Sequence, residues 1–393
     1  MKSSSRSEQA LFATCPHGLE ATLAEELESL GANDVRAAEG GSAFRGTLAT
    51  VYRVNYGSRI ASRVLLQVTR GRYRSEEDIY RGVYLLEWPG LFSADLTIRV
   101  NVSAIASPLK SLEFVTLRIK DAVCDRFRAE LNKRPSVDTV SPDVRIHAFL
   151  TAQEYTIYLD TSGAALFKRG YRTTAGEAPL RENLAAGVIR LTQWKPDWPL
   201  LDPMCGGATL LIEAAQMALA IPAGARRGFG FEKLHSFDPQ LWREVRSQWR
   251  SGPARSTLAI YGSDRDPAAV EAARRNLAAA GLAHAVHLRR ANALGISAPA
   301  DAGVLVINPP YGVRLEQQQS LERFYPKLGD ALKQNFAGWR AYIFTSDLRL
   351  PKLIGLTASK RTPLYNGALE CRLYEFKLVS GSMRRKAKDS DAT

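Results

Sequence analysis

A short polar and aromatic motif follows a hydrophobic run in the last third of the chain. Asn308, Pro309, Pro310 and Tyr311 come directly after residues 303–307. The two prolines fix the backbone in a stiff, extended path. The Asn308 oxygen and the Pro309 carbonyl can accept hydrogen bonds from an amino group, while Tyr311 can stack on a nucleobase. An amino group held in this way has its lone pair aimed at an electrophile, so positioning would supply the rate. Taken alone, the motif would favour a proline-rich turn that ends a buried strand.

A glycine-containing bend lies about a hundred residues earlier, at residues 199–209 (PLLDPMCGGAT). The sequence predicts a strand that runs through Asp202 into Gly206-Gly207 and then into a helix, and glycine lets a ligand approach the backbone closely. The bend has neither the G-x-G-x-x-G spacing of dinucleotide binders nor the Gly-Lys-Ser/Thr of a phosphate-binding loop. An acidic bend without phosphate-binding features suits a cationic or zwitterionic nucleoside. Taken alone, Gly-Gly before a helix is an ordinary turn.

Two further polar residues follow predicted strands. Asp264 comes just past residues 259–261, whereas Asp266 is expected to cap a helix that begins at Pro267. Because Asp264 is not needed as the cap, its carboxylate is free to bind two ribose hydroxyls, the alternative being a solvated aspartate. Asn292 follows a short strand at residues 285–288 and can either pair with an adenine edge or serve as a turn residue.

The C-terminal half alternates strands with long helices, which predicts a doubly wound parallel α/β sheet. Strands are expected at 200–201, 259–261, 303–307 and 341–345, with helices at 209–220, 268–280 and 321–336. Ligands of such sheets bind beyond the carboxyl ends of the strands. The four polar positions described above all occupy such ends.

The N-terminal half reads instead as a compact α+β module. Strands are expected at 11–13, 64–68, 96–100, 144–149 and 155–159, and helices at 19–30, from a Ser75 capping box onward, and over 112–131. The last helix has an apolar stripe with cations lying off it, which indicates either an RNA-contacting face or an ordinary solvated one. These cations and those of the segment that follows are Arg118, Lys120, Arg126, Lys133 and Arg134.

Composition sets the class of protein. The 393 residues are 45% hydrophobic and carry a formal charge of +13, which indicates a globular chain of two or three domains with a polyanionic partner such as nucleic acid.

The four cysteines are scattered, which predicts neither a metal site nor disulfides and favours the cytoplasm. No apolar run is long enough to cross a membrane. Residues 381–393 are expected to form a basic disordered tail.

The ordered set of strand ends resembles the class I S-adenosylmethionine-dependent methyltransferases of the Asn-Pro-Pro-Tyr, amino-methylating group. The N-terminal half resembles a THUMP RNA-binding domain preceded by a ferredoxin-like segment. The matching stretches are 109–114 (LKSLEF), 120–123 (KDAV), 134–138 (RPSVD), 159–163 (LDTSG), 167–172 (FKRGYR), 178–182 (APLRE), 228–233 (GFGFEK) and the hairpin 364–372 (LYNGALECR).

The family likeness is greatest to the bacterial 23S ribosomal RNA guanine-N2 methyltransferases, in their amino-methylating half. It implies a Rossmann-like, mostly parallel seven-stranded sheet, with a ferredoxin-like segment at 1–45, a THUMP domain at 46–160 and a methyltransferase domain at 161–380. It also implies S-adenosylmethionine as cofactor and guanosine N2 in structured RNA as substrate. Further RNA contacts are expected from Lys168, Arg169 and Arg172. The implied cofactor contacts are Pro179, Glu182, Asp202, Cys205, Gly206, Gly207, Thr209, Asp264, Asn292 and Asn308.

The chain departs from the family pattern Asp-Pro-x-Cys-Gly-Ser-Gly-Thr because Gly207 and Ala208 replace the serine and second glycine. Two alternatives therefore stay open. One is the same type of enzyme acting on transfer RNA or on adenine, DNA adenine included; the other is a non-catalytic RNA-binding or ribosome-assembly factor. The oligomeric state is not predicted.

Overall fold

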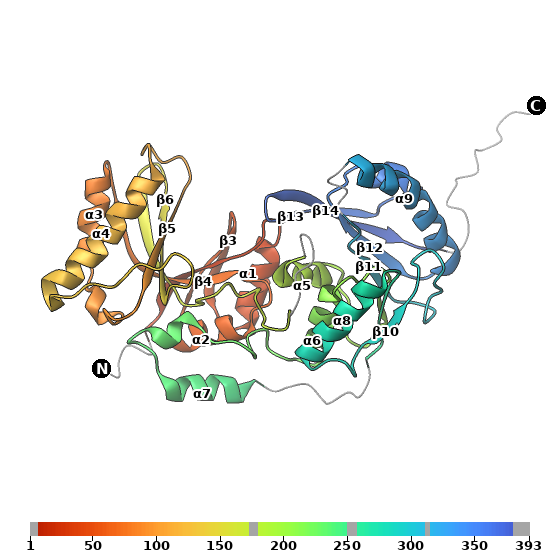
Figure 1. Ribbon diagram of the computed structural model, residues 1–393, viewed down its shortest axis with the longest axis horizontal. Helices are drawn as coiled ribbons and strands as arrows, with labels where there is room; N and C mark the ends of the chain where they lie inside the picture. Colours follow the sequence, from red (N-terminus) through yellow and green to blue (C-terminus); the bar gives the residue numbers. More distant parts are fainter. Residues whose placement is uncertain (1–6, 173–179, 250–257, 311–314, 380–393) are drawn as a thin grey trace, which may run out of the picture. The chain divides into compact units, whose positions relative to one another are not determined.

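The chain forms two compact units (Figure 1). The structure is a computed structural model that describes residues 7–172, 180–249, 258–310 and 315–379. The N-terminal unit contains Met1–Leu191, Gln216–Arg255 and Leu364–Gly367, and the C-terminal unit contains Thr192–Ala215, Ser256–Pro363 and Ala368–Thr393. The expected basic tail, Pro179 and Tyr311 lie outside the described residues.

The N-terminal unit is built on one seven-stranded sheet in the order β2-β3-β1-β4-β7-β6-β5. Neighbouring strands are antiparallel except β5 and β6, which run parallel. The strands are β1 (Gln9–Thr14), β2 (Asn33–Ala38), β3 (Gly41–Gly46), β4 (Arg63–Arg72), β5 (Ile98–Ala104), β6 (Val144–Leu150) and β7 (Glu154–Asp160). This confirms the strands expected from the alternating patterns of the N-terminal half.

Amphipathic helices cover the core face of this sheet. The Ser75 capping box with Asp78 is present and begins α3, and the apolar stripe of α4 is buried against β5 and β6. The helices are α1 (Glu20–Ser29), α2 (Leu48–Gly57), α3 (Glu76–Tyr84), α4 (Leu112–Leu131), α5 (Glu182–Leu191) and α7 (Pro239–Gln248), with short 3-10 turns η2 (Trp88–Gly90) and η3 (Gly230–Lys233).

The C-terminal unit is the predicted doubly wound sheet, in the order β10-β9-β8-β11-β12-β14-β13. The first five strands are parallel and β14 runs antiparallel to β12. The strands are β8 (Leu200–Asp202), β9 (Ile260–Asp264), β10 (His287–Arg290), β11 (Val304–Ile307), β12 (Arg340–Thr345), β13 (Lys360–Asn366) and β14 (Leu369–Lys377), joined by α6 (Thr209–Ala218), α8 (Pro267–Ala280), α9 (Leu315–Asn335) and α10 (Leu350–Leu353).

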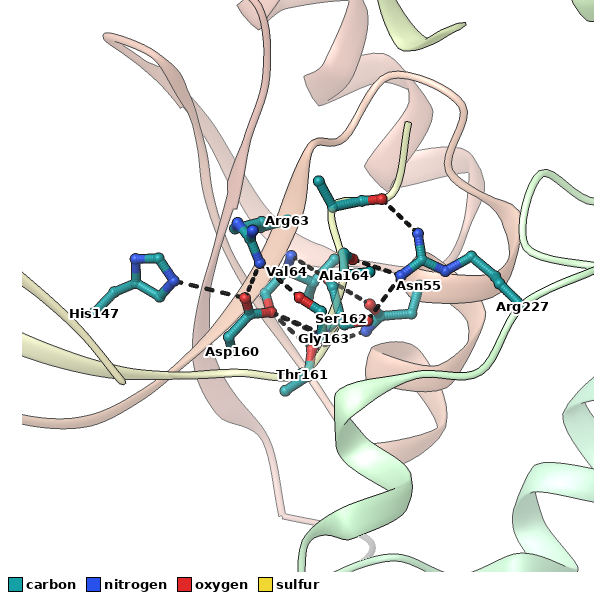
Figure 2. A network of polar contacts seen from close by, with 11 residues as sticks. Asn55, Arg63, Val64, His147, Asp160, Thr161, Ser162, Gly163, Ala164 and Arg227 are labelled. Carbon is teal, nitrogen blue, oxygen red and sulfur yellow. Dashed lines mark hydrogen bonds and ion pairs between the residues drawn. The ribbon is translucent and has the colours of Figure 1, made fainter. Parts of the chain in front are cut away.

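One insertion packs with the N-terminal unit although it lies in the C-terminal half of the sequence. Arg227 is partly buried and donates to the carbonyl oxygens of Ser162 (3.0 Å; Figure 2) and Ala165 (2.6 Å). Its burial lowers its pKa to about 10. The compact units therefore do not follow a cut at residue 160, and the domain boundaries given by the sequence remain a prediction.

Candidate active site

The order of the parallel strands brings the predicted polar residues to one edge of the sheet. From β8 the chain continues to β9 and β10 on one side, whereas β11 pairs with β8 on its other side. This reversal is the position at which open α/β sheets bind ligands. Asp202 ends β8, Asp264 ends β9 and Asn308 directly follows β11. Asp264 is thus the last residue of its strand rather than the first beyond it.

Hydrogen bonds join the glycine bend to the end of β9. The Cys205 N–H donates to the Ser263 carbonyl at 2.9 Å, and the Gly206 N–H donates to the Asp264 carboxylate at 3.1 Å. Gly206 has a φ of +50°, and a Cβ built there would meet no atom within 4 Å. The backbone of the bend is therefore open to a ligand at this residue, as the sequence predicted for a glycine.

Ala208 is one of the two residues at which the chain departs from the family pattern. It is buried and has a φ of +64°, within the small left-handed region that residues other than glycine rarely occupy. A left-handed alanine costs roughly 1–2 kcal/mol relative to its right-handed form. In this chain an alanine therefore adopts the left-handed conformation of the bend, at the cost of this strain.

Asn276 supports the bend and was not predicted from the sequence. Its side-chain amide donates to the Gly207 carbonyl at 3.0 Å. It is buried on the face of α8 that carries Ala273, Leu277 and Ala280. A polar residue within an apolar helical stripe is the signal that points to it, because buried amides require partners.

Two carboxylates make this edge acidic. Asp202 is only 1% exposed, and burial raises its pKa to about 8 despite a hydrogen bond from the Met204 N–H. The nearby charge of Asp264 adds to this increase in the pKa of Asp202. A cation bound here would stabilise the ionised form of Asp202.

Asp264 is available to a ligand because its neighbour caps the helix. Asp266 accepts from the Ala268 N–H at 2.9 Å and Pro267 begins α8, as expected. The two oxygens of Asp264 accept one backbone N–H each, from Gly206 and from Asp266. A carboxylate offers about four acceptor positions, so capacity for two hydroxyl groups remains.

Asn292 has the turn role that the sequence left open. Its side-chain oxygen accepts from the Leu294 N–H at 3.1 Å, two residues beyond β10. Its side chain is exposed, so its amide N–H groups can still reach a ligand. A groove of about 440 Å³ lies on the C-terminal sheet, and neither Asp264 nor Asn292 is among its lining residues. Its lining includes Tyr261, Ser263, His287 and Arg289.

Asn308 carries the most unusual atom of the site. Its side-chain oxygen is buried and accepts no hydrogen bond from any described residue. Leaving an acceptor buried without a partner costs about 1–3 kcal/mol, so a ligand that donates a hydrogen bond to this oxygen would recover that free energy. Pro309 is buried and Pro310 is exposed.

Two of the remaining predicted cofactor residues, Thr209 and Glu182, are the first residues of helices. Thr209 is the first residue of α6. Glu182 begins α5 in the N-terminal unit, where it is buried and accepts from Arg172 Nε at 3.1 Å. The structure does not test its predicted contact with the cofactor.

The cations predicted to bind RNA are for the most part already paired. The five with acidic partners are Arg118 (Glu77), Lys120 (Asp121), Arg126 (Glu130), Lys133 (Asp95) and Arg172 (Glu182). Arg169 is 2% exposed and donates to the Leu166 and Arg59 carbonyls, which argues against a surface contact with RNA. Arg134 and Lys168 are exposed, as the prediction requires.

Within the described ranges, no group of three His, Cys, Asp or Glu side chains could hold a metal ion. Nor does any helix in those ranges combine the length and apolar character that a membrane crossing requires.

Comparison with known proteins gives matches along almost the whole chain. Residues 169–375 match the family model of the RMKL-like methyltransferase domain, residues 73–160 the THUMP domain, and residues 10–65 the RlmL ferredoxin-like domain. A "Ribosomal RNA large subunit methyltransferase K/L" of Shewanella frigidimarina is 39% identical over 95% of the chain, but the chain spans only 53% of that relative. A "Putative RNA methyltransferase" of Synechocystis sp. is 38% identical over 93% of the chain and 96% of the relative.

A solved structure has the same fold. A protein described as a putative methyltransferase complexed with SAH superposes with a TM-score of 0.84 and 31% identity, covering 96% of this chain and all of that one. These matches confirm the resemblance to THUMP-containing methyltransferases and the fold class. The methyltransferase family model alone covers just over half of the residues of this chain. The chain therefore belongs to the RMKL-like methyltransferase family.

Proposed function

We propose that the chain transfers a methyl group from S-adenosylmethionine to the exocyclic N2 amino group of a guanosine in structured RNA, with 23S ribosomal RNA as the substrate. The observation that carries the proposal is the buried, unpartnered oxygen of Asn308 beside the acidic glycine bend. An acceptor for an amino group and a site for a cation are the two requirements of amino methylation.

The residues at the sheet edge fit the cofactor. The acidic bend from Asp202 to Gly207 would hold its cationic methionine end, and Asp264 would accept from its ribose hydroxyls. Asn292, whose side chain is exposed, would hold the adenine. The similar structure is described as complexed with SAH, which supports the choice of cofactor. When bound, the cofactor supplies an electrophilic methyl carbon on a sulfonium sulfur.

The chain's own residues would act by holding the base. Asn308 Oδ1 and the Pro309 carbonyl would accept the two N–H bonds of the amino group. This fixes the nitrogen and leaves its lone pair free to attack. Tyr311 would stack on the target base once that base has left the base stack of the RNA. This contact is worth roughly 1–3 kcal/mol. Orientation of the two reactants would then supply most of the acceleration.

Ribosomal RNA is favoured over other nucleic acids by the name of the Shewanella relative and by the THUMP match. Guanine rather than adenine rests on the family resemblance, because Asn308 can accept from either amino group. Transfer RNA remains the alternative substrate of the same chemistry.

The strained alanine of the bend favours one rival, a non-catalytic RNA-binding factor. Calorimetric titration of the full chain with S-adenosylmethionine and SAH distinguishes the two. The proposal predicts saturable binding of one molecule per chain. The rival predicts no heat of binding, and that result would overturn the proposed enzyme.

The pKa of Asp202 predicts a pH dependence of cofactor binding. Because Asp202 takes up a proton below about pH 8 and a bound cation favours its ionised form, binding must release that proton. We expect affinity for S-adenosylmethionine to fall by up to about tenfold per pH unit below pH 8. Calorimetry in buffers of different ionisation enthalpy measures the released proton. Asp202→Asn should remove this dependence, whereas an equal slope in both proteins would contradict it.

A further inference from the structure

The N-terminal sheet carries an aromatic and arginine-rich face opposite α3 and α4. On β6, buried Val144, Ile146, Ala148 and Leu150 alternate with other residues, and these four join the core beneath α3 and α4. The intervening side chains must therefore point to the opposite face. These are Arg145, His147 and Phe149.

Neighbouring strands extend this face. Arg99 of β5 is in register with Arg145, and Tyr158 of β7 is in register with His147. The Phe12 ring of β1 lies with its centroid 6.4 Å from that of Tyr158. We call these six residues the platform: Phe12, Arg99, Arg145, His147, Phe149 and Tyr158. All six are partly exposed.

The platform has positive charge that no described residue neutralises. Asp160 is fully buried and forms an ion pair with Arg63, with His147 Nε2 at 3.6 Å (Figure 2). Arg145 forms no ion pair with any described residue, and its Nε is buried without a hydrogen-bond partner. Burial and the like charge of Arg63 lower the pKa of Arg145. A bound anion would counter both the burial and the like charge that lower the pKa of Arg145.

Aromatic rings beside guanidinium groups that no described carboxylate neutralises suit one class of ligand, although Arg99 also donates to the Thr139 carbonyl. Unpaired bases stack on aromatic side chains, while arginines bind the phosphates between them. A duplex keeps its bases stacked on one another and cannot offer their faces. On α4, Arg118 and Arg126 lie over the rings of Tyr80 and Tyr84, but their charges are already paired with Glu77 and Glu130.

We propose that the platform binds an unpaired segment of RNA, with bases on Phe149, Tyr158 and Phe12 and phosphates on Arg99 and Arg145. This inference rests on the proposed function, because it takes RNA as the substrate. It moves the main RNA contact from α4, where the sequence placed it, to the opposite face of the sheet.

The test compares two charge-matched double variants of the full chain. Arg99→Gln with Arg145→Gln changes the platform, and Arg81→Gln with Arg128→Gln removes two exposed arginines from α3 and α4. The probe is a fluorescent oligoadenylate of about 12 nucleotides, followed by anisotropy across salt concentrations. We expect the platform variant to lose at least about tenfold in affinity near 0.15 M salt, with its salt slope reduced by about 1.4. The control should stay within about twofold of wild type.

Phe149→Leu provides an independent arm, since it keeps an apolar side chain and removes the ring. We expect about fivefold weaker binding of the single strand and no change for a duplex of the same length. Equal losses in the platform and control pairs, or equal loss of duplex binding in Phe149→Leu, would overturn the proposal. Thermal unfolding of each variant verifies folding. SAH titrations of the same proteins distinguish a failure of the platform proposal from a failure of the proposed function. A chain without an active site would bind no SAH and would still bind RNA on the platform.

Discussion

Replacing Asn308 with alanine is expected to abolish methyl transfer while the affinity for SAH stays near that of the wild type. The substitution removes the buried acceptor that faces no described donor, so the amino group would lose its orientation toward the methyl carbon. Losing one preorganised hydrogen-bonding group at a reacting centre typically costs on the order of 10²–10³ in kcat. Single-turnover assays with labelled S-adenosylmethionine measure this loss.

Asn308→Asp is the matched variant, because a carboxylate also accepts hydrogen bonds and has almost the same shape. It should retain more activity than Asn308→Ala. Unchanged turnover in Asn308→Ala would contradict the role in holding the base. A parallel loss of SAH affinity would instead assign Asn308 to the cofactor alone.

Replacing Asp264 with alanine should weaken cofactor binding by about 10²-fold or more. Its carboxylate would lose two charge-assisted hydrogen bonds to the ribose, each worth about 1.5–3 kcal/mol. The Gly206 N–H would also lose its acceptor, which loosens the bend. Isothermal titration of S-adenosylmethionine measures the change in affinity.

Two further variants separate these effects. Asp264→Asn keeps an acceptor for Gly206 and loses the charge, so its affinity should fall between those of the wild type and Asp264→Ala. Asp266→Asn removes the same charge two residues away and keeps a good helix cap, so it should bind like the wild type. Equal affinity of Asp264→Ala and the wild type would remove the ribose assignment.

The sequence predicts the fold well where local patterns decide the structure. The hydrophobic runs at 303–307 and 341–345 are the buried strands β11 and β12, and the Ser75 capping box begins α3 as expected. The positions of Asp202, Asp264 and Asn308 at adjoining strand ends also follow from strand order. Each of these features depends on residues close together in the chain or on a general rule of α/β sheets.

Features set by distant contacts could not be predicted in the same way. Arg118 appeared free on its helix, yet its partner Glu77 lies 41 positions earlier and on another helix. Arg227 belongs to an insertion whose anchoring carbonyls are more than 60 positions away. The left-handed backbone of Ala208 and the support from Asn276 likewise depend on the packed bend. The resemblance named the family, but only the fold shows which cations are already neutralised.

The most direct test of the whole account is to identify the nucleoside that receives the methyl group. The full chain would be incubated with labelled S-adenosylmethionine and unmethylated 23S ribosomal RNA, and the digested RNA analysed by mass spectrometry. The account predicts label in N2-methylguanosine at one position, and none with Asn308→Ala. Label on a ring carbon, on a ribose oxygen or on no nucleoside at all would contradict the claim that Asn308 holds an exocyclic amino group for methylation.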